Sequence, residues 1–231
     1  MLAIKGLEKA SLIDYPGKVS AVVFLAGCNF RCPFCQNRDL VLEPEKLESI
    51  PEKEILDFLK ERKKWLDGVC VTGGEPLLWK DLPDFLGRIK GLGYLVKLDT
   101  NGTSPKMLRE LIERGLVDFI AMDIKGPLEK YEKFSGAEAD KQKIRESIKL
   151  IINSGIEHEF RSTVLPALHT KEDVEEMARM VKGARKFYLQ QFRPRNTLDQ
   201  NFLKEKPFSE KEMLGLRDLC RRYVDTDVRL A

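Results

Sequence analysis

The amino-acid sequence predicts an α/β fold in which a parallel sheet forms a partial (β/α)6 barrel. Short apolar or β-branched runs alternate with amphipathic stretches, which is typical of repeated β/α units. A cluster of polar residues or glycines follows each apolar run. A complete barrel of this kind has eight units. Only six are found here, so we expect an open barrel with a wide mouth.

The expected strands are short and rich in β-branched or aromatic residues, as strands covered on both faces usually are. In chain order they are Val19–Leu25, Gly68–Thr72, Tyr94–Asp99, Phe119–Asp123, His158–Val164 and Lys186–Phe192. The earlier run Ile4–Leu7 is expected to form an extra edge strand or a hairpin before the turn at Tyr15–Gly17.

The expected helices begin at residues whose side chains can accept a hydrogen bond from an unpaired backbone N–H. Capping boxes are expected at Ser49–Glu52 and Ser209–Glu212, with an acidic variant at Thr170–Asp173. The pair Ser104-Pro105 places proline at the first helical position, where it is tolerated.

The composition is that of an ordinary globular protein, with 231 residues, 42% hydrophobic residues and a formal net charge of +3. We expect one domain over residues 1–231, with a strand and turn over 1–18, the barrel core over 19–194, and a loop and C-terminal helix over 195–231. The small charge argues against a nucleic-acid surface. No apolar run approaches the roughly 18 residues of a membrane helix, and no export signal is visible. We therefore expect a cytoplasmic protein.

Three of the five cysteines lie together directly after the first barrel strand. Cys28, Cys32 and Cys35 have the spacing C-x3-C-x2-C. Structural zinc normally has four protein ligands, and iron–sulfur clusters ordinarily have four cysteines. A cubane cluster held by only three cysteines would leave one iron open to a substrate. A zinc- or cluster-binding interaction module with a distant fourth ligand is the non-enzymatic alternative.

This spacing, with the aromatic Phe34 before the third cysteine, resembles the signature of the radical S-adenosylmethionine (SAM) superfamily. The resemblance implies a radical SAM fold of the TIM type. It also implies a [4Fe–4S] cluster on the three cysteines, with SAM bound to the open iron through its amino and carboxylate groups. Reductive cleavage of SAM would yield methionine and a 5′-deoxyadenosyl radical, and Phe34 would lie near the adenine.

Other motifs at strand ends extend the resemblance. The segment Thr72–Pro76 is similar to the family's GGEP motif, which implies that Gly73, Gly74, Glu75 and Pro76 bind the SAM ammonium. Leu98–Gly102 and Met122–Lys125 resemble motifs of glycyl-radical-enzyme activases. By that resemblance Asp99, Asn101 and Asp123 belong to the cofactor site, and Lys125 engages the SAM carboxylate.

Two details of this site stay open in the sequence. The activase resemblance implies a possible monovalent cation held by Asp99, Thr100 and Asp123. Activases often present a histidine to the ribose after the sixth strand, but the segment Gln190–Pro194 has none. The ribose contact is therefore left to Gln190, Gln191 or Arg193.

The resemblance implies a radical SAM oxidoreductase that generates a glycyl radical on a partner enzyme under anaerobic conditions. The expected partner is an anaerobic ribonucleotide reductase, and the expected electron donor is a flavodoxin- or ferredoxin-type protein. Removing a glycine hydrogen as an atom needs no acid or base, so no catalytic residue is expected beyond the cluster and SAM site. The competing interpretation is an enzyme acting on a small molecule, similar to the 7-carboxy-7-deazaguanine synthases. Such an enzyme needs a pocket closed by polar residues, whereas an activase should leave it open to a peptide loop.

Several further residues are not expected to react. The segment Arg193–Pro207 is the best candidate for a mobile loop. Cys70, Cys220, Trp65 and Trp79 are expected to pack. His158 and His169 are expected to be packing or surface residues rather than ligands.

Overall fold

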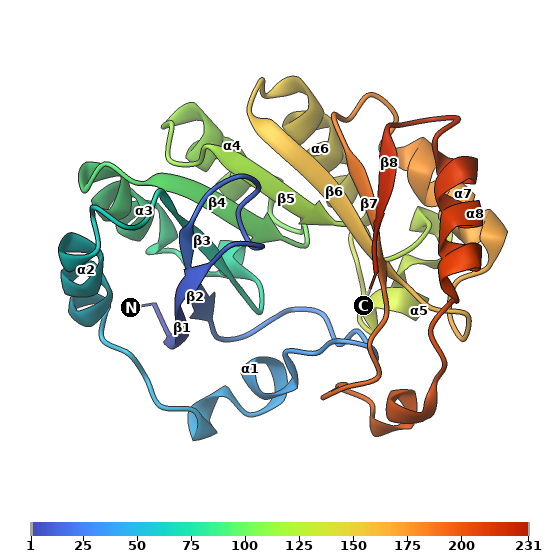
Figure 1. Cartoon of the computed structure of the whole chain (residues 1–231), viewed down its shortest axis with the longest axis horizontal. Helices are drawn as coiled ribbons and strands as arrows, with labels where there is room; N and C mark the ends of the chain where they lie inside the picture. Colours follow the sequence, from blue (N-terminus) through green and yellow to red (C-terminus); the bar gives the residue numbers. More distant parts are fainter. Residues whose placement is uncertain (1, 231) are drawn as a thin grey trace.

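The computed structural model describes residues 2–230, which form one curved eight-stranded sheet (Figure 1). The strands are β1 (Ile4–Ser11), β2 (Ser20–Leu25), β3 (Gly68–Gly73), β4 (Leu95–Thr100), β5 (Phe119–Asp123), β6 (Glu157–Val164), β7 (Phe187–Gln191) and β8 (Thr226–Arg229). They lie in the sheet in sequence order. β1 pairs antiparallel with β2, and every later neighbouring pair is parallel.

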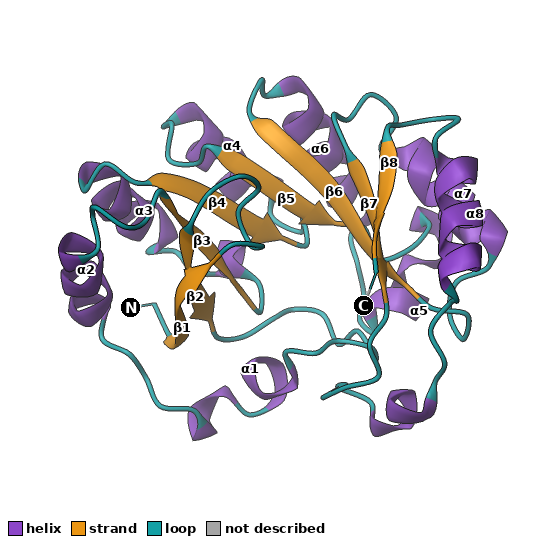
Figure 2. Ribbon diagram, viewed as in Figure 1, coloured by secondary structure: helices purple, strands orange, loops and turns teal. Residues whose placement is uncertain are grey.

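Most helices lie along the outer face of the curved sheet, as Figure 2 shows. The helices are α1 (Arg38–Leu42), α2 (Glu52–Glu61), α3 (Leu82–Gly91), α4 (Pro105–Glu113), α5 (Tyr131–Ser135), α6 (Lys141–Asn153), α7 (Lys171–Met180) and α8 (Glu210–Cys220). α1 belongs to the long connection that crosses the open side of the arch. This arrangement follows from βαβ crossovers of one hand, which place successive helices on the same side of the sheet.

The partial barrel expected from the sequence is confirmed, with one more parallel strand than the six predicted. β8 pairs with β7 in parallel, and β1 extends to Ser11 rather than ending at Leu7. Within residues 2–230, β1 and β8 each pair with a single neighbour, so the barrel stays open between these two edges. β8 has only four residues, of which two are charged and only Val228 is apolar, so its sequence does not resemble a buried parallel strand.

The core lies between the sheet and its outer helices, and apolar side chains on the inner face of the sheet also fill part of the barrel interior. Central strands are buried on both faces, as in β2, where Ala21, Val22, Val23 and Leu25 are all at most 1% exposed. This explains why the strands appear in the sequence as nearly continuous apolar runs. No helix among the described residues is long and apolar enough to cross a membrane.

Two of the three predicted capping boxes are confirmed. Thr170 and Ser209 each cap their helix reciprocally with the residue three positions later. The prediction at Ser49 is wrong, because the extended Pro51 is the residue that precedes α2, with no side-chain cap. The Ser49 hydroxyl instead accepts a hydrogen bond from Lys5 Nζ. The prediction that Trp65 packs is also wrong, since it lies after α2 and is 72% exposed.

Candidate active site

The site lies at the C-terminal ends of the parallel strands, where a cavity of about 380 Å³ is found. Loops from several strands converge at this edge in barrel folds. Eleven of the fourteen predicted site residues line the cavity: Cys28, Cys32, Cys35, Phe34, Gly73, Gly74, Asp99, Asn101, Asp123, Lys125 and Gln190. Glu75 and Pro76 are buried beside it, and Arg193 lines a neighbouring cavity.

The cysteine loop leaves β2 and is fixed by backbone contacts. The Arg31 N–H donates to the Ser135 carbonyl at 2.7 Å, and the Cys35 N–H donates to the Cys32 carbonyl at 3.0 Å. Burial raises the pKa of Cys28 to about 11 and that of Cys32 to about 12. The thiols are therefore neutral at pH 7 by themselves, and a coordinating metal would have to displace their protons.

The segment after β7, for which the sequence predicts a mobile loop, forms hydrogen bonds with the cysteine loop. The N–H groups of Leu198 and Asp199 donate to the carbonyls of Cys35 and Pro33 at 2.9 and 3.0 Å. Asn196 Nδ2 donates to the Gln36 carbonyl at 3.1 Å. These are long-range contacts between irregular segments, so local sequence patterns do not reveal them. The segment therefore braces the cysteine loop.

Two glycines let the end of β3 lie against the start of the cysteine loop. Gly73 has φ +120°, and a Cβ at Gly74 would lie 1.8 Å from the Gly27 carbonyl oxygen. That carbonyl accepts from the Glu75 N–H at 2.8 Å, while Asn37 Nδ2 donates to the Gly73 carbonyl at 2.7 Å. The GGEP segment and the cysteine loop therefore form one bonded unit.

Replacing Gly74 with alanine is expected to separate these two segments. The added methyl group meets backbone rather than a flexible side chain, so overpacking should cost about 1–3 kcal/mol of unfolding free energy and weaken SAM binding. Gly215→Ala is the matched control, because Gly215 is in α8 with open space at its Cβ, and it should stabilise by about 0.5–1 kcal/mol. Urea denaturation of both variants checks this. Equal stability of the two would contradict the close approach.

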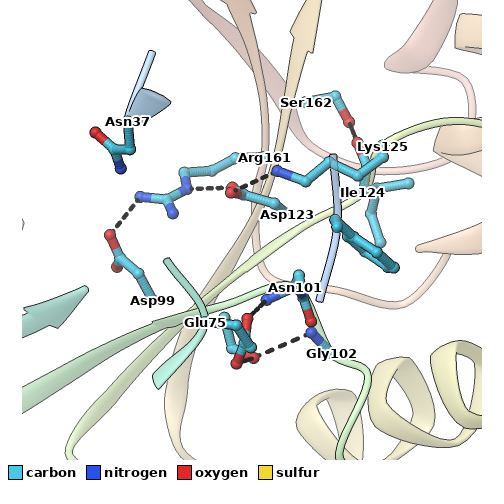
Figure 3. Close-up of polar contacts among 12 residues, drawn as sticks. Asn37, Glu75, Asp99, Asn101, Gly102, Asp123, Ile124, Lys125, Arg161 and Ser162 are labelled. Atoms are coloured by element: carbon cyan, nitrogen blue, oxygen red, sulfur yellow. Dashed lines mark hydrogen bonds and ion pairs between the residues drawn. The ribbon is translucent and has the colours of Figure 1, made fainter. Parts of the chain in front are cut away.

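Glu75 is fully buried and holds the end of β4 in place (Figure 3). Its carboxylate accepts from the Leu77 N–H at 3.1 Å, the Thr100 hydroxyl at 2.7 Å and the Asn101 N–H at 2.6 Å. Burial, only partly offset by these donors, raises the pKa of Glu75 to about 7. In this structure Glu75 joins the β3 and β4 ends, so it supports the wall of the cavity from behind.

The raised pKa of Glu75 predicts a distinctive pH effect. Between its ordinary value of 4.5 and about 7, the folded protein keeps a proton that the unfolded chain loses. The wild-type stability should therefore fall as pH rises through this window, by up to about 1.4 kcal/mol per pH unit from this group. Glu75→Gln cannot titrate, so its stability relative to wild type should rise from pH 5 to pH 7.5. Urea unfolding of the two SAM-free proteins measures this. A difference in unfolding free energy between Glu75→Gln and wild type that stays constant across that range would contradict the prediction.

Four charged side chains from β4, β5 and β6 and the residues after them form a connected network in the cavity (Figure 3). Arg161 donates to Asp123 at 2.9 Å and to Asp99 at 3.2 Å, and Lys125 donates to Asp123 at 3.0 Å. Lys97 forms a further ion pair with Asp99. Although burial raises the pKa of both aspartates, the adjacent basic side chains hold both values below the ordinary one.

Arg161 is the main site residue that sequence reasoning missed. It lies inside the predicted strand His158–Val164, and a single arginine there gives no motif. A signal was nevertheless present, because a charged residue in a strand covered on both faces needs a buried partner. The two aspartates expected to hold a monovalent cation both bind Arg161 here. The cation itself stays a prediction.

His169 packs as expected and supports the same wall. Its Nε2 lies 3.1 Å from the Lys125 carbonyl oxygen, and its ring stacks on Phe134 with the centroids 4.6 Å apart. Phe34 meets the same imidazole edge-on at 6.2 Å. Burial lowers the pKa of His169 to about 4, so the ring is neutral at pH 7.

Residues 22–182 match the family model for the Radical SAM superfamily. The chain belongs to the radical SAM superfamily. A Methanocaldococcus jannaschii protein, named provisionally as a glycyl-radical enzyme activating enzyme, is 36% identical to this chain. The match covers 97% of this chain and 94% of the Methanocaldococcus jannaschii protein. The pyruvate formate-lyase-activating enzyme of Listeria monocytogenes is 32% identical over 53% of this chain and 52% of its own. These matches place the radical SAM chain in the activating subgroup of the superfamily.

Other relatives and structures agree on the fold. A 7-carboxy-7-deazaguanine synthase of Thermoplasma acidophilum is 36% identical over 46% of this chain and 47% of its own. The crystal structure of Streptococcus suis SuiB bound to its precursor peptide SuiA superposes with a TM-score of 0.69 and 15% identity. That match covers 90% of this chain and 48% of SuiB, so this radical SAM chain spans about half the length of that protein.

Membership of the superfamily implies a [4Fe–4S] cluster and SAM, and the residues present fit both. Cys28, Cys32 and Cys35 line one cavity and supply the thiolates that iron–sulfur clusters use. Among residues 2–230, no three histidine, cysteine or acidic side chains come close enough to hold one single metal ion. Lys125 offers a cation for a carboxylate, and glycine backbone lines the same space.

Proposed function

We propose that this radical SAM enzyme generates a glycyl radical on a partner protein, with an anaerobic ribonucleotide reductase as the first candidate partner. One observation carries the proposal: the cysteine-lined cavity shares lining residues with a second cavity of about 650 Å³, and that second cavity is lined by Ile13 and Leu230 beside the two unpaired edges of the sheet. A protein segment could enter there. The near-full-length match to the Methanocaldococcus jannaschii activating enzyme supports the same reaction.

The cluster and SAM, when bound, supply a reductive cleavage that yields methionine and a 5′-deoxyadenosyl radical. We propose a flavodoxin- or ferredoxin-type protein as the source of the electron. In the proposed reaction the Cα–H bond of the target glycine would break homolytically. Its hydrogen atom would go to C5′ to form 5′-deoxyadenosine, and the unpaired electron would stay on the glycine α-carbon. No proton is transferred, so the chain needs no general acid or base.

The chain's own residues would bind and orient the reactants. Cys28, Cys32 and Cys35 would hold the cluster at one end of the cavity. Lys125, with its pKa raised by Asp123 despite burial, keeps a fixed positive charge for the SAM carboxylate. Gln190 lines the cavity and is our proposed ribose contact, while Arg193 lies outside that cavity.

The test uses the anaerobically reconstituted protein with SAM, dithionite and a candidate glycyl radical enzyme. We expect a glycyl doublet in electron paramagnetic resonance that requires both proteins, with 5′-deoxyadenosine formed in equal amount. A partner whose target glycine is replaced by alanine is the control. Robust 5′-deoxyadenosine formation without a radical on any candidate would count against activation.

The small-molecule alternative is favoured by the match to 7-carboxy-7-deazaguanine synthases over about half of the chain. That reaction acts on a small molecule and predicts a substrate pocket closed by polar side chains. Incubation with the substrate of those enzymes separates the two functions, because formation of the deazaguanine product would support the alternative directly.

A further inference from the structure

Cys28 differs from the other two cysteines of the triplet in the groups that face its sulfur. The Phe30 N–H donates to Cys28 Sγ at 3.4 Å, and Asn101 Nδ2 lies 3.9 Å from the same sulfur as a second donor. In the described part of the chain, the sulfurs of Cys32 and Cys35 have no such donor. The Asn101 contact is long, but a thiolate carries a negative charge and attracts an N–H more strongly than a neutral thiol does.

The side-chain amide of Asn101 is held in the orientation that aims its nitrogen at this sulfur. Its Oδ1 accepts from the Thr103 backbone N–H at 3.1 Å and from the Thr103 hydroxyl at 2.7 Å. A backbone N–H can only donate, so the amide atom that faces it must be the oxygen. The amide nitrogen therefore lies on the opposite side, toward the cysteine loop.

Both hydrogens of this nitrogen have a defined direction. An amide nitrogen carries two N–H donors. One of them donates to Asn29 Oδ1 at 2.9 Å, which leaves the other for Cys28 Sγ. Asn29 is fixed in turn, because its Nδ2 donates to the Thr103 hydroxyl at 3.0 Å. The side chains of Asn29, Asn101 and Thr103 therefore form a closed ring of hydrogen bonds that links the cysteine loop to the loop after β4.

The backbone of Asn101 is held as firmly as its side chain. Its N–H donates to the buried Glu75 carboxylate at 2.6 Å (Figure 3). Asn101 is only 5% exposed, so water screens its contact with the sulfur little. The N–H that faces Cys28 is thus a fixed dipole in a partly dry site, already in place before any change of charge at the sulfur.

We propose that Asn101 raises the reduction potential of the cluster by donating a hydrogen bond to the Cys28 sulfur. Hydrogen bonds to the sulfurs are among the features that set the potential of an iron–sulfur cluster. Reduction adds one electron and makes the sulfurs more negative, so a fixed N–H stabilises the reduced state more than the oxidised one. Asn101 acts through Cys28, which makes it a positioning residue. The inference concerns the cluster that the superfamily implies, and it holds whichever substrate the enzyme has.

The test measures the midpoint potential of the anaerobically reconstituted protein without SAM, by a redox titration read with electron paramagnetic resonance. Asn101→Leu removes the donor, whereas Asn101→Asp keeps the oxygen that Thr103 binds and turns a second oxygen toward the sulfur. At a fixed solution potential, we expect the reduced-to-oxidised ratio to fall about threefold to tenfold in Asn101→Leu, where tenfold corresponds to about 59 mV for one electron. Asn101→Asp should lower it further. Because SAM is left out, loss of a SAM contact cannot produce this shift.

The same two substitutions at Asn153 are the matched controls. Asn153 is exposed at the end of α6, on the outer helical layer. Its variants should keep the wild-type potential, and iron and sulfide per chain should be equal in all the proteins. An unchanged potential in Asn101→Leu, or an equal shift in the Asn153 variants, would overturn the inference. Failure of both Asn101 variants to hold a cluster would overturn it too, since a donor that only tunes the potential is not needed for assembly.

These outcomes are distinguishable from those of the glycyl-radical experiment. A lowered potential in Asn101→Leu, with no glycyl radical on any partner of the wild-type enzyme, would sustain the role of Asn101 and count against the proposed function. A glycyl doublet formed by the wild-type enzyme, with an unchanged potential in Asn101→Leu, would sustain the proposed function and overturn the role of Asn101.

Discussion

Replacing Cys32 with serine is expected to abolish both cluster assembly and SAM cleavage. Cys32 is 6% exposed, lies between Cys28 and Cys35 in the loop, and lines the same cavity as both. A serine hydroxyl is less acidic than a cysteine thiol, and its oxygen is a harder ligand than a thiolate sulfur. Serine therefore does not replace cysteine on iron. With two thiolates left, the site cannot hold a cubane with one open iron. Iron and sulfide per chain after anaerobic reconstitution, and 5′-deoxyadenosine formed with dithionite, measure the loss.

Cys220→Ala is the matched control for this experiment. Cys220 is fully buried in α8, and its Sγ lies 3.7 Å from the Val174 carbonyl oxygen, far along the chain from the cluster loop. Its loss removes a small buried side chain, so it should lower stability modestly and leave the iron content at the wild-type value. Full iron content in Cys32→Ser, or loss of iron in Cys220→Ala, would contradict the assignment of the cluster to the triplet.

The sequence was sufficient to locate the cavity, because its parts are local motifs. Cys28 to Cys35, Gly73-Gly74 and Asp99 to Asn101 each follow a strand with a clear apolar pattern, and parallel strands bring such ends to one edge. The role of Glu75 was less accessible. Its carboxylate is buried behind the cavity wall because three donors from two strand ends converge on it.

The errors concern features that depend on tertiary contacts. The backbone hydrogen bonds between the loop at Arg193–Pro207 and the cysteine loop are tertiary contacts of this kind, and no local pattern encodes them; the mobility of this loop stays a prediction. Ser49 has the right spacing for a capping box, but the extended residue Pro51 lies between it and the helix. The Ser49 hydroxyl instead accepts a hydrogen bond from Lys5. Trp65 lies four residues beyond the end of α2, so the packing of that helix against the sheet does not bury it.

Replacing Arg161 with methionine is expected to cost about 3–5 kcal/mol of unfolding free energy, because it leaves two buried carboxylates short of a partner. Arg161 is 13% exposed, and Asp99 and Asp123 are 14% and 30% exposed, so solvent screens these pairs little. Arg161→Lys keeps the charge but cannot present a planar fork to both carboxylates, so its loss should be smaller. Arg109→Met breaks an exposed pair with Glu146 and should change stability by at most about 0.5 kcal/mol.

The pH dependence of the Arg161→Met effect distinguishes lost charge pairing from lost packing. In the native protein Arg161 helps to hold the pKa of Asp99 and Asp123 below the ordinary value of 3.8. Such groups contribute stability above their unfolded pKa and lose it as pH falls toward their folded pKa. Without Arg161 the folded pKa of both carboxyls rises, so the variant loses less stability on acidification than wild type. The difference between the two proteins should therefore be constant from pH 6 to pH 8 and narrow below about pH 4. Urea unfolding over this range measures it, and a deficit that stays the same at low pH would assign the cost to packing of the arginine side chain instead.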